Sequence, residues 1–188
     1  MRSSRVSTSK KIPAIPPEIA DWFAVREWRV RRHQADMLAA SDAGRPALLV
    51  ADTGAGKTLA GFLPTLADFA PLRLAGAPPP EGLHTLYVSP LKALAVDIAR
   101  NLERPIAEMG LPVTTETRTG DTPQNRRRRQ KENPPDILLT TPEQIAQIGF
   151  LDVVMAPVDG GYTLSLPELV ETLEALRARV VIPMHAFG

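Results

Sequence analysis

The sequence predicts an α/β fold with a mostly parallel sheet and helices on both of its faces. Apolar runs of strand length alternate along the chain with helical segments, a pattern typical of a parallel sheet. One such run, residues 47–50, leads into a glycine-rich segment ending in Lys57 and Thr58, and a helical pattern follows. A strand, a glycine-rich loop and a helix in this order indicate a P-loop. The predicted class is therefore a P-loop NTPase.

Four helices are expected up to residue 109, because apolar residues recur with helical spacing between proline, glycine or polar turn signals. They cover residues 17–23, a segment through Gln34 that ends near residue 44, about 57–69 and 91–109. The third is expected to stop before a proline-rich surface loop at residues 71–82. Residues 1–14 are basic and contain no acid, and they are expected to form a disordered tail.

Four short strands are expected up to residue 140, at residues 47–50, 83–88, 113–117 and 136–140. A strongly basic helix at residues 124–131 separates the last two. Its four consecutive arginines point around all sides of a helix and cannot form one DNA-binding stripe. We interpret it as a solvated helix that attracts phosphate. Thr141 and Pro142 then supply an N-cap and a first-turn proline for another helix.

Composition and charge limit the classes of protein to which the chain can belong. The 188 residues suffice for one α/β domain, and 44% hydrophobic with 23% charged residues indicates a soluble globular protein. The lack of cysteine excludes disulfides, Cys-ligated zinc and thiol catalysis. No apolar run is long enough to span a bilayer and no secretory signal is recognisable, so we expect a cytoplasmic protein without membrane contact. With a net charge of +1, any DNA contact requires a local patch.

The glycine-rich segment is the first candidate site, with ATP and Mg²⁺ as its expected cofactors. Its glycines allow the backbone amides to turn inward on an anion, and the following helix adds its N-terminal dipole. Lys57 is expected to reach the β- and γ-phosphates, and the Thr58 hydroxyl to hold Mg²⁺. Lys57 and Thr58 are therefore the candidate catalytic residues. The phosphate-binding candidates are Thr53, Gly54, Ala55, Gly56, Lys57 and Thr58.

Gln34 is a candidate for contacting the base of the nucleotide. A side-chain amide can pair with N6 and N7 of adenine. Without other evidence, Gln34 would be interpreted as a solvent-facing helix residue. The adenine role is favoured only because a P-loop follows it in the sequence. Ligands of parallel α/β sheets bind at the carboxyl ends of the strands, where the P-loop, Ser89, Thr119 and Thr141 are expected.

Five motifs in order resemble the first RecA-like domain of superfamily 2 DExH-box helicases. They are Gln34 and residues 51–58, 87–94 (Tyr-Val-Ser-Pro-Leu-Lys-Ala-Leu), 119–122 (Thr-Gly-Asp-Thr) and 140–143 (Thr-Thr-Pro-Glu). The chain is most similar to the bacterial ligase-associated DNA-damage-response helicases, which belong with the large helicase-related proteins. The resemblance covers roughly residues 15–147, which would be a truncated RecA-like ATP-binding domain, so the fold would be incomplete.

The resemblance implies an ATP-dependent DNA helicase acting in repair on single-stranded or partly duplex DNA, with DNA ligase and a nuclease as potential partners. It assigns sugar-phosphate contacts to three segments, where hydroxyls, amides and helix N-termini suit phosphate binding without sequence readout. For each segment, ordinary turn and capping chemistry is the alternative, and both roles can coexist. One departure is the charged Asp52 within the P-loop. The implied residues are Ser89, Pro90, Leu91, Lys92, Thr119, Gly120, Thr141 and Pro142.

The sequence departs from the helicase pattern after Gln147. The Asp-Glu-x-His segment that holds Mg²⁺ and polarises water is absent, as is a second RecA-like domain. Residues 148–188 predict a strand, a helix and a strand, and they are similar to the C-terminal part of metallo-β-lactamase-fold hydrolases. His185 would be a metal ligand there, but the His-x-His-x-Asp-His cluster of that family is missing. We therefore place a junction between two folds near residues 147–150.

Asp159 could replace the Mg²⁺-holding acid of the absent Asp-Glu-x-His segment, although Pro157 and the glycines after Asp159 fit the hydrolase ending better. Three functions other than a helicase also remain open. The chain could be a nucleotide-binding module without turnover, or a fragment of a metal-dependent hydrolase. A P-loop kinase is a further alternative, but it has no use for a row of backbone-phosphate contacts.

Overall fold

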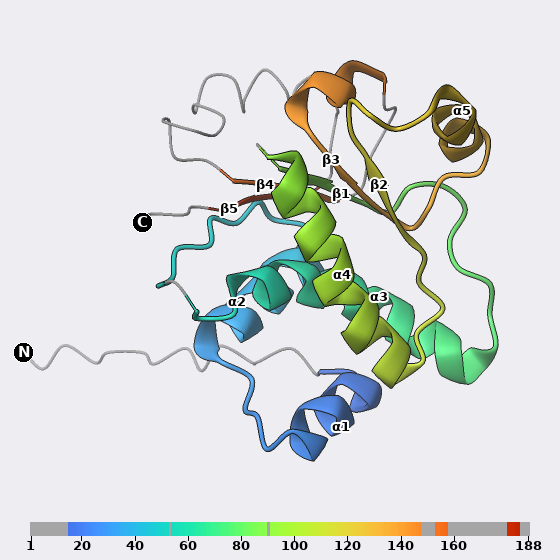
Figure 1. The fold of residues 1–188 in the computed structure, drawn as a ribbon. Coiled ribbons are helices and arrows are strands. Elements are labelled where there is room, and N and C mark those ends of the chain that lie inside the picture. Colours follow the sequence, from blue (N-terminus) through green and yellow to red (C-terminus); the bar gives the residue numbers. More distant parts are fainter. Residues whose placement is uncertain (1–14, 53, 90, 148–152, 158–179, 185–188) are drawn as a thin grey trace, which may run out of the picture.

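A five-stranded parallel sheet organises the chain, in the order β2-β3-β1-β4-β5 (Figure 1). The computed structural model describes residues 15–52, 54–89, 91–147, 153–157 and 180–184. The α/β fold with a mostly parallel sheet is confirmed. The strands are β1 (Thr85–Val88), β2 (Thr115–Arg118), β3 (Ile137–Thr140), β4 (Val153–Pro157) and β5 (Val180–Met184).

In Figure 1, helices α2, α3 and α4 gather on one side of the sheet, α1 lies at the far end of this group, and α5 lies near β2. Apolar side chains of α3 and α4 pack with those of β1 and β3 into one core. Within the described part of the chain, no helix has the length and apolar character needed to cross a bilayer. The helices are α1 (Pro17–Val25), α2 (Arg32–Asp42), α3 (Lys57–Ala75), α4 (Lys92–Met109), α5 (Gln124–Glu132) and the 3-10 helix η1 (Pro142–Gln147).

The helix after the P-loop is longer than predicted. We expected α3 to end near Phe69, but it continues past Pro64 and Pro71 to Ala75. Each proline removes one backbone hydrogen bond. Phe62, Leu63, Leu66 and Phe69 on this helix are fully buried, and their burial offsets that cost. The helix instead ends at Gly76, whose φ of +57° suits a residue without Cβ.

The strand predicted at residues 47–50 is not part of the sheet, and that prediction was wrong. Only Leu49 forms an isolated bridge, while Leu48 and Val50 are 65% and 63% exposed. Of the apolar side chains at residues 48–50 only Leu49 is buried, so the segment gains little of the apolar burial that stabilises a strand in a sheet. β5, paired with β4, forms the end of the sheet beside β4 instead.

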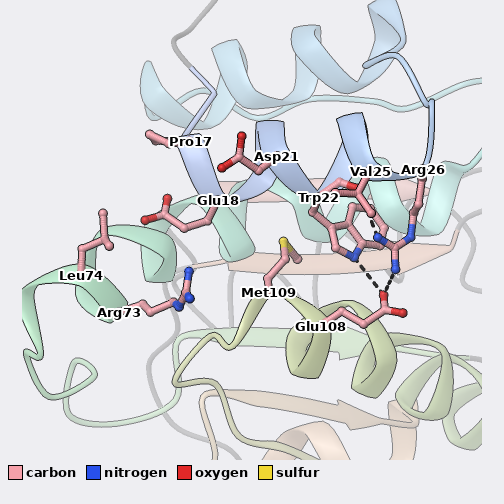
Figure 2. Close-up of a pocket in the computed structure, with 10 residues that line it drawn as sticks. All are labelled: Pro17, Glu18, Asp21, Trp22, Val25, Arg26, Arg73, Leu74, Glu108 and Met109. Carbon is pink, nitrogen blue, oxygen red and sulfur yellow. Dashed lines mark hydrogen bonds and ion pairs between the residues drawn. The ribbon is translucent and has the colours of Figure 1, made fainter.

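Glu108 of α4 fixes helix α1 to the domain (Figure 2). Its carboxylate accepts a hydrogen bond from the Trp22 indole N–H at 2.9 Å and pairs with Arg26, whose guanidinium lies over the Trp22 ring at 4.2 Å. The Trp22 hydrogen bond, together with Arg104 and the charge of Arg26, holds the pKa of Glu108 below its ordinary value of 4.5. An ionised Glu108 therefore contributes to the docking of α1, together with the burial of Ile19, Trp22 and Phe23 in the core.

We expect this docking to weaken in acid. Because the pKa of Glu108 is lowered on folding, its contribution is complete above the ordinary carboxyl pKa and is lost as the pH falls below it. Tryptophan fluorescence between pH 7 and pH 3 should show a transition that Glu108→Gln removes. Glu103→Gln, at an exposed position on the same helix, should leave it in place. A transition unchanged in Glu108→Gln would assign the docking to other groups.

Candidate functional site

The P-loop lies at the N-terminus of α3. Gly54 and Gly56 have φ angles of +78° and +77°, a conformation that L side chains rarely adopt. The Lys57 Nζ donates a hydrogen bond to the Ala51 carbonyl oxygen at 2.6 Å, so this side chain folds back over the loop. Thr53 lies outside the described residues. The free N–H groups of the first turn of α3 therefore adjoin a lysine, which is a suitable arrangement for an anion.

Thr58 and Asp52 are two further polar residues of the P-loop. Thr58 is the second residue of α3 and is half-buried, which places an oxygen ligand next to Lys57. Mg²⁺ in nucleotide sites takes few protein ligands and completes its shell with phosphates and water, so a single hydroxyl fits. Asp52 is exposed, and its carbonyl oxygen accepts the N–H of Ala55 at 3.1 Å in the turn of the loop.

Gln34 lies beside the P-loop, as the adenine interpretation requires. It is 3% exposed, and a Cβ added to Gly56 would lie 3.5 Å from its Nε2. Its Oε1 already accepts the backbone N–H of Arg31 at 2.9 Å. Because a carbonyl oxygen has two lone pairs, this bond orients the amide and leaves capacity for a ligand.

A cavity of about 550 Å³ joins Gln34 to the P-loop. Four lining residues come from the segment between α1 and α2, and sequence reasoning assigned none of them to the nucleotide. Trp28 is the most distinctive, because it is 54% exposed despite its size. Glu27 has a φ of +56°, a rare conformation for a non-glycine residue. The lining residues are Phe23, Glu27, Trp28, Arg29, Arg31, Gln34, Gly54, Gly56 and Leu59.

The three predicted backbone-binding segments meet at one edge of the sheet. Thr140 of β3 is in register with Val88 of β1 on one side and with Arg118 of β2 on the other. The next residues, Thr141, Ser89 and Thr119, therefore leave three adjacent parallel strands at the same level. This confirms that Ser89, Thr119 and Thr141 lie at the carboxyl ends of adjacent strands. The P-loop was predicted at the same edge, but the residues before it do not form a strand of the sheet.

Several side chains of these segments serve the protein itself. Ser89 is fully buried and its hydroxyl donates to the Leu91 carbonyl oxygen at 2.9 Å. Thr119 and Thr141 are 5% and 6% exposed. Pro142 begins η1 and is half-buried, and Pro90 lies outside the described residues. The turn and capping chemistry left open by the sequence is thus present in this region.

Among the described members of the group, Leu91, Lys92 and Gly120 are exposed. Lys92 at the start of α4 forms an ion pair with Asp121 in the next segment. This ion pair joins two segments that follow different strands. In the described part of the chain no three His, Asp or Glu side chains gather as a metal site would require, and His185 and Asp159 lie outside that part.

Comparison with known proteins identifies the family. The DEAD/DEAH box helicase family matches residues 31–159, which include Gln34, the P-loop and all three convergent segments. The chain belongs to the DEAD/DEAH box helicase family. The match continues past residue 147 through β4, so the family similarity extends beyond the boundary that we expected for the RecA-like part.

The chain is similar to several Lhr proteins. The chain is 40% identical over 177 residues to the Lhr helicase/probable uracil glycosylase of Mycolicibacterium smegmatis, covering 88% of the chain and 10% of that protein. It is 30% identical over 197 residues to the ATP-dependent helicase Lhr-Core of Methanothermobacter thermautotrophicus, covering 100% of the chain and 21% of the relative. The chain therefore spans only a small part of the length of these relatives.

A solved structure supports the same fold. The Mycobacterium smegmatis helicase Lhr bound to ssDNA and AMP-PNP matches with a TM-score of 0.73 at 31% identity, over 90% of this chain and 24% of that one. The DUF1998 helicase MrfA bound to DNA and AMPPNP matches with a TM-score of 0.70 at 21% identity, which shows the fold alone. These matches support a RecA-like helicase fold.

Proposed function

We propose that this chain is the ATP-binding and DNA-binding front part of an ATP-dependent DNA helicase motor. The cavity shared by Gln34 and the P-loop glycines carries this proposal, because it offers a base site and a phosphate site in one continuous space. In this proposal, Lys57 holds the β- and γ-phosphates, Gln34 contacts adenine, and Thr58 supplies an oxygen ligand to Mg²⁺. The exposed Trp28 at the same cavity provides a flat surface for stacking the base.

We further propose single-stranded or partly duplex DNA as the partner of the segments after β1, β2 and β3. The solved Lhr relative holds ssDNA, and the convergence of three segments on adjacent strands is suited to one continuous phosphate backbone. The name of one relative pairs the helicase with a uracil glycosylase. This name is consistent with the role in DNA repair that we propose. A cytoplasmic location, and DNA ligase and a nuclease as partners, are proposed from the sequence resemblance alone.

The first test is Mg²⁺-ATP binding and hydrolysis by the purified chain, with and without an oligo-dT strand. We expect ATP binding. DNA-stimulated turnover would establish a motor and require an acid such as Asp159 in place of the missing Asp-Glu-x-His segment. Binding without turnover would favour the nucleotide-binding module. Absence of both from folded protein would overturn the proposal.

Replacing Gln34 with alanine should reduce base selectivity more than phosphate binding. A bidentate amide contact to adenine contributes about 1–3 kcal/mol of discrimination. The preference for ATP over GTP should therefore fall by about five- to 150-fold, while binding of inorganic triphosphate stays near the wild-type level. Competition against a fluorescent ATP analogue measures all three ligands. An unchanged preference would assign base selection to other groups of the cavity.

A further inference from the structure

The four arginines of α5 have three different environments. Arg126 and Arg129 donate to the Glu116 carboxylate at 3.1 and 2.5 Å, and Arg128 donates to Glu132 at 2.8 Å. These three are exposed, as the prediction of a solvated helix requires. Arg127 differs, because it is half-buried and points into the turn that follows β2.

Arg127 binds three backbone carbonyl oxygens of this turn. Its Nε donates to Thr122 at 2.8 Å, and its Nη2 donates to Thr119 at 3.2 Å and to Gly120 at 2.6 Å. The turn is also closed by its own bonds, from the Thr122 N–H to the Thr119 carbonyl oxygen at 3.0 Å and from the Thr119 N–H to the Thr122 hydroxyl at 2.9 Å. A planar guanidinium fork is suited to bind several acceptors at fixed angles.

The carbonyl contacts determine where the remaining N–H groups point. The C=O of Thr119 and the N–H of Gly120 belong to one peptide unit, and in a trans peptide the two bonds point in opposite directions. The same holds for the C=O of Gly120 and the N–H of Asp121, and no described peptide bond is cis. Both N–H groups therefore point away from Arg127. Among the described residues no hydrogen bond uses either of them.

We propose that Arg127 is a positioning residue that holds this turn with the N–H groups of Gly120 and Asp121 directed at a DNA phosphate. Gly120 and Asp121 are exposed, and a Cβ at Gly120 would meet no atom within 4 Å, so the opposite side of the turn is open. Two adjacent amides form an anion-binding pair, and the guanidinium polarises them from behind. The proposal rests on the DNA-binding function proposed above and assigns Arg127 no phosphate contact of its own.

The alternative is that Arg127 contacts phosphate directly as a positive charge. The Arg127→Lys variant distinguishes this direct contact from the proposed positioning of the turn. A lysine keeps the charge but cannot place three hydrogen bonds in a fork. If Arg127 positions the turn, Arg127→Lys should weaken oligo-dT binding by at least about tenfold, as should Arg127→Ala. In Arg127→Ala the plot of log affinity against log salt concentration should keep its slope, whereas the loss of one direct phosphate contact would make that slope shallower by about 0.7. Arg128→Lys is the matched control and should bind like the wild type.

Amide hydrogen exchange provides a readout that needs no DNA. The Thr119 and Thr122 amides close the turn, so both should exchange faster in Arg127→Lys than in the wild type and in Arg128→Lys. Near-wild-type DNA affinity of Arg127→Lys, or unchanged exchange at both amides, would overturn the positioning role while the proposed function stands. A wild-type chain that exchanges as expected but does not bind oligo-dT would overturn the proposed function and with it the phosphate role of the turn.

Discussion

Lys57→Ala should reduce the affinity for Mg²⁺-ATP by at least about 100-fold. The lysine ammonium is the main positive charge expected at the β- and γ-phosphates, and charge-assisted hydrogen bonds to it are about twice as strong as neutral ones. Its side chain already lies over the loop, with Nζ at 2.6 Å from the Ala51 carbonyl oxygen. Little ordering of this side chain is therefore needed when phosphate replaces the carbonyl. Isothermal titration calorimetry measures the change directly.

Two controls separate this effect from a loss of folding or of charge. Lys131→Ala removes a lysine from the exposed side of α5 and should bind ATP like the wild type. Oligo-dT binding by Lys57→Ala should also stay near the wild-type level, because the convergent segments lie after β1, β2 and β3 and not at the P-loop. If Lys57→Ala binds ATP within about threefold of the wild type, the cavity between Gln34 and the P-loop is not the nucleotide site.

The order of the elements was predictable because their signals are local. Strands β1, β2 and β3 and helices α1, α4 and α5 lie within a few residues of the predicted segments, since each segment is bounded by turn residues nearby. The length of α3 was not predictable in this way. Its two prolines are local stop signals, whereas the burial of Phe69 that outweighs them depends on the rest of the core. The strand predicted at residues 47–50 was wrong for a similar reason, because the exposure of Leu48 and Val50 depends on how the rest of the chain packs and not on the local apolar pattern.

The residues of the candidate site also fall into those that the sequence predicted and those that it could not predict. Motif order placed Gln34 near the P-loop and the three segments at one edge, since the topology of a parallel α/β sheet dictates where strand ends meet. Trp28 was missed because its exposure at the cavity accompanies an unusual backbone angle at Glu27, and a positive φ at a non-glycine residue leaves no sequence signal. The role of Arg127 was also missed. Four arginines in a row look equivalent until the acceptors on β2 and on its turn are known.

Phe62→Ala should lower the free energy of unfolding by about 3–5 kcal/mol. Phe62 is fully buried on α3, and its ring centroid lies 5.7 Å from that of Tyr87 on β1. Removing the ring leaves a cavity between the P-loop helix and a central strand, and close-packed neighbours relax only partly into such a space. Urea unfolding followed by circular dichroism measures the change. Leu74→Ala is the matched control, because this residue is on the same helix but 73% exposed, and it should change stability by less than about 0.5 kcal/mol.

The same substitution tests whether packing on β1 positions the P-loop. Phe62 lies five residues after Lys57, so a shift of α3 on the sheet moves the N–H groups that face the phosphates. Phe62→Leu keeps most of the apolar volume and should remain folded at 25 °C with a smaller loss of stability. If its affinity for Mg²⁺-ATP falls while the protein stays folded, the contact with Tyr87 contributes to the geometry of the phosphate site. If its affinity equals that of the wild type, this contact stabilises the fold without adjusting the P-loop.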